Sequence, residues 1–145
     1  MEGGTMSKAP KWFVPVAVLA FIWNLLGCLA FAFDLMASPE DIAQLSEAEQ
    51  AIYAARPVWS VVGTGMAVIL GALGSLGLIL KKSWSLPLLA LSLIGVILQD
   101  ISLFLLSGAG AMIGVTVYVL QGLVLIISVL LVLMALRGKQ NNWLG

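Results

Sequence analysis

The chain has 145 residues, of which 61% are hydrophobic and 10% are charged. Soluble domains are usually about 45–50% apolar and about 25% charged, so this composition excludes an ordinary soluble globule and indicates an integral membrane protein. Seven basic residues balance seven acidic ones, so the basic excess typical of nucleic-acid binding is missing. With a single cysteine, Cys28, and no histidine, we expect no metal site, no cofactor and no catalytic residues.

Four apolar segments account for most of the chain. They cover approximately residues 12–35, 57–80, 84–106 and 114–136. Each is close to the ~20 residues that cross a ~30 Å hydrocarbon core as a helix. The segments are apolar throughout rather than alternating, which favours helices over the strands of a membrane barrel. We therefore expect an all-α fold: one integral membrane domain, 1–145, with four transmembrane helices running up-down-up-down as a bundle.

The basic residues flank these segments mainly on one side of the membrane. In an up-down-up-down bundle, six of them share that side: Lys8, Lys11, Lys81, Lys82, Arg137 and Lys139. Arg56 alone falls on the other side. The positive-inside rule then places both termini in the cytoplasm and the connection 38–56 outside.

The connection 38–56 carries two signals for the start of a helix. Ser38 precedes Pro39 and two acidic residues, and Ser46 precedes Glu49 at the spacing of a capping box. Apolar residues recur there at helical spacing: Ile42, Leu45, Ala48 and Ile52. We expect a short helical loop on the bilayer or over the external end of the bundle, as one kinked helix or as two short ones.

A stripe of small residues runs along the second segment. Gly63, Ala67, Gly71 and Ser75 follow one another at intervals of four. Small residues at this spacing form a groove in which another helix can approach closely. The stripe therefore predicts tight helix packing, with a partner either in the same chain or in a second subunit of a homo-oligomer.

Four polar residues lie well inside the predicted helices, at similar depths in the middle and external half of the membrane. They are Asn24, Gln99, Asp100 and Gln121. Asn and Gln at such positions bond neighbouring helices, whereas an Asp deep in a membrane helix costs roughly 2.5–3.5 kcal/mol and normally faces protein, water or a partner. We expect an intramembrane polar cluster, with Asp100 near Gln121 or Asn24 in a small cavity open toward the external loop. Its role is either structural or functional.

Several short sequences in the first three segments carry a resemblance to known proteins. They are Pro10-Lys11-Trp12-Phe13, Trp23-Asn24-Leu25-Leu26-Gly27, Ser38-Pro39-Glu40, Glu47-Ala48-Glu49-Gln50 with Tyr53, Gly71-Ala72-Leu73-Gly74-Ser75-Leu76 and Lys81-Lys82-Ser83-Trp84. Over roughly residues 10–106 the chain resembles an uncharacterised family of small bacterial four-span inner-membrane proteins, often labelled sugar transporters without a demonstrated activity. The resemblance implies a multi-pass protein of the bacterial inner membrane. Asp100 departs from it, since a more hydrophobic residue such as Met is expected after Gln99.

Two classes of function fit this pattern. The first is a binding or assembly protein that holds a lipid, a small hydrophobic ligand or a partner membrane protein. The alternative is an oligomeric transporter or permeation pathway for a small solute, including a proton-linked form that uses Asp100. We expect no enzymatic activity, because thiol–quinone chemistry needs paired cysteines and glutathione-type enzymes need Arg within their helices.

Overall fold

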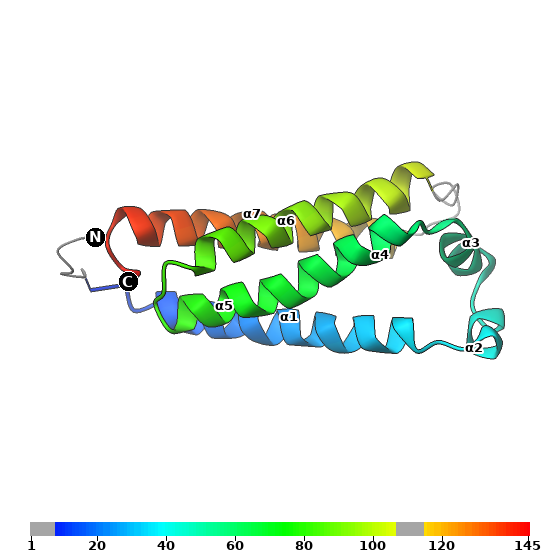
Figure 1. The fold of residues 1–145 in the computed structure, drawn as a ribbon, viewed down its shortest axis with the longest axis horizontal. Helices are drawn as coiled ribbons and strands as arrows, with labels where there is room; N and C mark the ends of the chain where they lie inside the picture. The colour runs from blue at the N-terminus through cyan, green and yellow to red at the C-terminus, as the bar shows by residue number, and fades with distance from the viewer. Residues whose placement is uncertain (1–7, 107–114) are drawn as a thin grey trace.

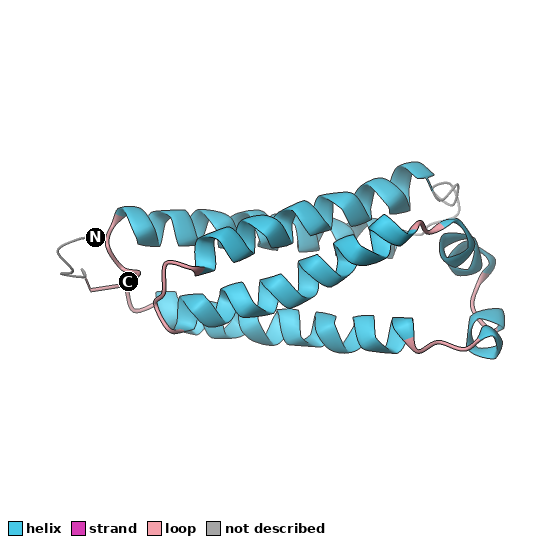
Figure 2. Cartoon of the chain, in the orientation of Figure 1, coloured by secondary structure: helices cyan, strands magenta, loops and turns pink. Residues whose placement is uncertain are grey.

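The computed structural model describes residues 8–106 and 115–145, and every regular element in these ranges is a helix (Figures 1 and 2). In chain order the helices are α1 (Phe13–Leu35), α2 (Pro39–Ala43), α3 (Glu47–Ala55), α4 (Val58–Gly65), η1 (Met66–Leu70), α5 (Gly71–Ile79), α6 (Ser85–Ile101), η2 (Ser102–Leu106) and α7 (Val115–Gln140). The elements η1 and η2 are single π-helical turns.

Four helical segments are long and apolar enough to cross a membrane. They are Phe13–Leu35, Val58–Ile79, Ser85–Phe104 and Tyr118–Gln140. The second consists of α4, η1 and α5 in series, and the third consists of α6 and most of η2. The predicted all-α four-helix membrane bundle is confirmed (Figure 1). The fourth helix continues past its predicted end at residue 136, and its predicted start at residue 114 lies outside the described residues.

The connection between the first two spans forms two helices, α2 and α3, and not one kinked helix. At the start of α2, the Ser38 hydroxyl accepts a hydrogen bond from the Asp41 amide, and the Asp41 carboxylate accepts one from the Ser38 amide. These bonds hold the pKa of Asp41 below its usual value. Ser46 caps α3 by accepting from the Glu49 amide. Of the expected apolar face, Ile42 and Leu45 are half-buried. The side chains of Ala48 and Ile52 lie outside the described part.

The small-residue stripe packs against helices of the same chain. A methyl group added at Gly63 would lie 3.0 Å from the Leu98 Cβ on α6, and one added at Gly95 would lie 2.4 Å from the Gly63 carbonyl oxygen. The Ser92 hydroxyl donates a 2.6 Å hydrogen bond to the Ala67 carbonyl across the same contact. Only residues without a large side chain permit two helix backbones to come this close. The partner that the stripe predicted is therefore α6, with α1 meeting it at Gly71.

The end of the bundle that bears residues 8–13, the turn 81–83 and residues 141–145 is called the terminal end here, and the end that bears α2 and α3 is called the loop end (Figure 1). The buried core sits at the terminal end. Its members are Phe13, Ala17, Ala20, Leu78, Leu89, Leu131, Met134, Ala135 and Leu144.

Backbone hydrogen bonds fix the terminal end. Lys81 adopts φ 56°, and the Lys82 amide donates to the Gly77 carbonyl, so that α5 ends in a left-handed cap. The last residue, Gly145, pairs with the turn at both Lys81 and Ser83. The ring of Trp143 lies edge-on against Phe13, with 5.5 Å between ring centroids. The tail after α7 thus ties the ends of three spans together.

Candidate functional site

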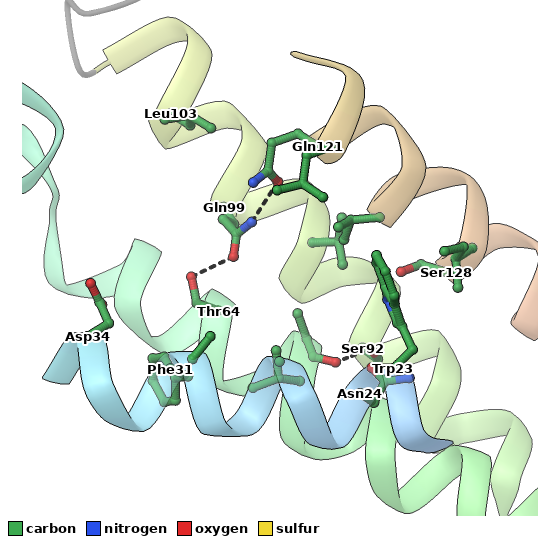
Figure 3. A pocket seen from close by; sticks show the side chains of 18 of the residues that line it. Trp23, Asn24, Phe31, Asp34, Thr64, Ser92, Gln99, Leu103, Gln121 and Ser128 are labelled. Carbon is green, nitrogen blue, oxygen red and sulfur yellow. Dashed lines mark hydrogen bonds between the residues drawn. The ribbon is translucent and has the colours of Figure 1, made fainter. Parts of the chain in front are cut away.

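A cavity of about 790 Å³ lies in the bundle between the middle of the four spans and the loop end. It exists because α1 packs chiefly on α5 and η1, while α7 packs chiefly on α6. The outer helices α1 and α7 therefore face one another across a space that protein does not fill (Figure 3). Leu89 and Leu131 line the cavity and also belong to the core, so the packed terminal end forms its floor.

The walls of the cavity differ in chemistry. The α4, η1 and α6 wall contributes polar side chains, including Ser60, Thr64 and Gln99. The α1 and α7 edges are largely apolar, Leu26 and Leu120 on them are 60% and 48% exposed, and α1 and α7 are not among the helix pairs that pack closely. The cavity consequently opens sideways between α1 and α7. In a membrane, this opening faces the lipid.

A chain of side-chain hydrogen bonds runs along the cavity wall from α4 through α6 to α7 (Figure 3). The Thr64 hydroxyl donates to the Gln99 Oε1 atom at 2.8 Å, and the Gln99 Nε2 atom donates to the Gln121 Oε1 atom at 2.9 Å. The structure thus brings together two members of the predicted polar cluster, Gln99 and Gln121, and adds Thr64, which the sequence reasoning missed.

Asn24 lines the same cavity but bonds elsewhere. Its Nδ2 atom donates to the Ala20 carbonyl at 2.9 Å and, at 3.5 Å, to the Ser75 hydroxyl on α5. A methyl group added at Gly71 would lie only 2.2 Å from the Asn24 Oδ1 atom. The carboxamide of Asn24 is therefore packed at the α1–α5 contact, where it joins the two helices.

Asp100 lines a different groove from the cavity that the other three residues of the predicted cluster line. It lines a separate shallow groove with Ile97, Ile101, Phe104 and Leu125, and its Oδ1 atom is buried with no hydrogen-bond partner in the described part of the chain. Asp100 therefore does not share the cavity of Gln121 and Asn24, and no hydrogen bond joins it to either residue in the described part of the chain. Successive residues on a helix point about 100° apart, so when Gln99 faces the cavity, its neighbour Asp100 faces away.

Charged residues meet at the loop end of the cavity. The Asp34 carboxylate at the end of α1 accepts a hydrogen bond from the Tyr53 hydroxyl and forms a 2.8 Å salt bridge with the Arg56 Nη1 atom. The Arg56 guanidinium also lies 4.7 Å from the centre of the Tyr53 ring. We call Asp34, Tyr53 and Arg56 the mouth cluster. It fastens α3 to α1 at the rim of the cavity, since both Asp34 and Arg56 line it.

Hydrogen bonding within the mouth cluster raises the pKa of Tyr53 above its usual value, chiefly because its hydroxyl donates to the Asp34 carboxylate. Burial of the ring and the negative charges of Asp34 and Glu49 raise it further, and Arg56 opposes them. The sequence contained a signal for this cluster. Asp34 lies at the end of the first span and Arg56 just before the second, so an acidic and a basic residue fall at the same end of the bundle.

Three serines on the cavity wall lie outside the predicted polar cluster. Ser60 and Ser102 are 2% and 3% exposed, and Ser128 is half-buried. Within the described residues none of their hydroxyls makes a hydrogen bond with another protein group. No set of three or more His, Cys, Asp or Glu side chains there is arranged to hold a metal ion. The site can therefore offer hydrogen bonds and apolar contacts to a ligand.

Comparison with family models, curated proteins and solved structures found none that matches this chain.

Proposed function

We propose that this membrane protein binds a small amphiphilic molecule of the lipid phase in the cavity between α1 and α7. The cavity itself carries this proposal. Its volume of about 790 Å³ falls within the ~300–1,000 Å³ typical of small-molecule sites. Apolar walls with a few convergent polar groups are also typical of such sites.

The sideways opening favours a ligand that arrives from the bilayer. A molecule dissolved in lipid can pass between Leu26 on α1 and Leu120 on α7 without crossing a charged surface. At the loop end the approach from water passes Asp34, Glu49 and Arg56. The geometry supports an apolar ligand with a polar part that reaches the Gln99–Gln121 bond.

Transport is the alternative function. A permeation pathway would need an exit at the terminal end, where Leu89 and Leu131 close the cavity and the tail residues cover the helix ends. A proton-linked form that uses Asp100 draws no support from the cavity, because Asp100 is not part of its lining. Binding is therefore the simpler proposal.

We further propose that the terminal end faces the cytoplasm. It bears residues 8–13, residues 141–145 and the turn with Lys81 and Lys82, and the basic residues Arg137 and Lys139 lie in the last turn of α7. Arg56 is the basic residue of the connection at the opposite end. This distribution agrees with the positive-inside rule, and the resemblance to bacterial four-span proteins supports an inner-membrane location.

Native mass spectrometry can test the binding proposal. The protein would be extracted with its surrounding lipids into polymer nanodiscs and released from them in the spectrometer. We expect the wild type to retain one bound molecule that the Ser128→Phe variant loses, because the new ring occupies the cavity. Leu133→Phe is the matched control, since Leu133 is 53% exposed on the same helix. Equal adducts on all three proteins would show surface lipid and contradict the proposal.

A further inference from the structure

The hydrogen bonds along the cavity wall have a direction. The Thr64 hydroxyl donates to Gln99, and the Gln99 amide nitrogen donates to the Gln121 oxygen. The acceptor oxygen of Gln121 is thereby engaged, and its amide nitrogen keeps two hydrogens. This nitrogen makes no hydrogen bond within the described residues. The chain therefore ends in a donor on the wall of the cavity (Figure 3).

The other free polar groups on the wall can also donate. They are the hydroxyls of Ser60, Ser102 and Ser128. The strong acceptors of the lining lie at the rim, as Asp34 and Glu49 do, or at a helix contact, as Asn24 does. Both oxygens of Asp34 accept bonds from the mouth cluster, and the Asn24 Oδ1 atom lies against Gly71 at a helix contact. The cavity is thus matched to a ligand that supplies acceptors.

The charges at the rim disfavour an anionic ligand. Among the described residues, Arg56 is the one basic residue in the cavity lining, and it is paired with Asp34. Glu49 adds a negative charge to the same rim. A phosphate or carboxylate would have to displace Asp34 from Arg56, whereas an uncharged acceptor needs no such exchange.

Building on the proposed function, we infer that the ligand is an uncharged lipid-phase molecule whose carbonyl oxygen accepts a hydrogen bond from the Gln121 amide. The apolar remainder contacts the α1 and α7 edges, including Phe31 and Val124. A quinone ring and a glycerol ester both supply this chemistry. Leaving a buried donor without its partner is unfavourable, so Gln121 selects for the acceptor.

Decylubiquinone is the probe for the quinone form. Quinones quench indole fluorescence on contact, and Trp23 lines the cavity, so we expect saturable quenching of the wild type in detergent micelles that Trp23→Phe largely removes. Gln121→Met keeps the side-chain length but lacks the donor. It is expected to weaken binding by about 3- to 10-fold, as loss of one hydrogen bond does. Leu123→Met, on an exposed position of the same helix, should leave the affinity unchanged.

An infrared measurement distinguishes the loss of the hydrogen bond in Gln121→Met from weaker binding that is caused by poor folding. Hydrogen bonding lowers the stretching frequency of the bound quinone carbonyl in the wild type, and the shift should persist in Leu123→Met and vanish in Gln121→Met. Monoolein, an uncharged ester, is the second probe: displacement of decylubiquinone by monoolein, or monoolein binding alone, supports the ester form of the same chemistry.

Two results would overturn the inference. One is saturable binding of neither probe, and the other is binding that Gln121→Met and Leu123→Met affect equally. If the wild type still retains an adduct that Ser128→Phe removes, the proposed binding function stands and only the ligand class is wrong. If that adduct is missing as well, both proposals fail.

Discussion

The two ends of the bundle are built in opposite ways. At the terminal end, Phe13, Leu78 and Ala135 are fully buried, and backbone pairing ties residue 145 to the turn at Lys81. At the loop end, α1 and α7 lie apart, a cavity separates them, and polar contacts between α3 and α1 replace apolar packing. Side chains that hold a fold together are packed, and groups kept free for a ligand are not. The difference assigns stability to the terminal end, and it supports the binding that we propose for the loop end.

Removing the ring of Phe13 should produce the largest loss of stability. Phe13 is 0% exposed and contacts Trp143 across the terminal end. Phe→Ala in a soluble core costs about 3–5 kcal/mol. In a membrane protein, lipid is as apolar as the core, so part of the free energy of transferring the ring out of water is missing. We therefore expect Phe13→Ala to lower the unfolding free energy by about 2–3 kcal/mol. Denaturation in mixed micelles measures this change.

Phe33→Ala is the matched control, because Phe33 lies on the same helix at the loop end and is 63% exposed. Its loss should change the unfolding free energy by less than about 0.5 kcal/mol. Equal effects of the two substitutions would show that the terminal end is no more important to stability than the loop end.

The contact between the second and third spans should respond to a single methyl group. A methyl group at Gly95 would lie 2.4 Å from the Gly63 oxygen and 2.7 Å from the Ala67 nitrogen, and neither backbone atom can move aside cheaply. We expect Gly95→Ala to lower the unfolding free energy by about 1–3 kcal/mol. Gly122→Ala, on α7, meets nothing within 4 Å and should be neutral. A neutral Gly95→Ala would contradict the close packing on which the cavity's shape depends.

The sequence predicted the parts of this molecule that depend on composition and on depth. Long apolar segments can satisfy their backbone groups in lipid only as helices, so the four spans were predictable. Gln99 and Gln121 lie at the same depth on neighbouring helices, and they bond. Depth alone did not predict which cavity Asp100 would line, because the side of the helix on which a residue lies also matters. On the third span, Ser92, Gly95, Gln99 and Ser102 share one face of the helix, and Asp100 is not on that face.

Other features depend on three-dimensional detail that a sequence pattern does not carry. The π-helical turns η1 and η2 interrupt apolar segments whose composition does not change at those points. The separation of α1 from α7 depends on how each packs on its neighbours, not on its own sequence. Ser60, Ser102 and Ser128 are common polar residues in membrane helices, and only the cavity distinguishes them from serines at helix contacts.

The smallest expected effect concerns the mouth cluster and its response to alkaline pH. The hydrogen bond to Asp34 raises the pKa of Tyr53, so the folded protein holds the Tyr53 proton more tightly than the unfolded chain, whose tyrosine pKa is about 10. Stability from this bond is then fully present below pH ~10 and is lost as the pH rises through the higher folded value. Arg56 still holds Asp34 after Tyr53 ionises, so the mouth cluster loosens without separating.

Tyr118→Phe leaves Tyr53 as the remaining tyrosine, since the chain has two. In this background, the ultraviolet absorbance of tyrosinate should show a titration midpoint above about 10, and adding Asp34→Asn should lower it because the amide oxygen is a weaker, uncharged acceptor. Acceleration of decylubiquinone entry over the same pH range would connect the mouth cluster to the cavity that it borders. A midpoint at the ordinary tyrosine value that Asp34→Asn leaves unchanged would show that α3 is not held to α1 by this bond, and the loop end would then be more open than the contrast with the terminal end already implies.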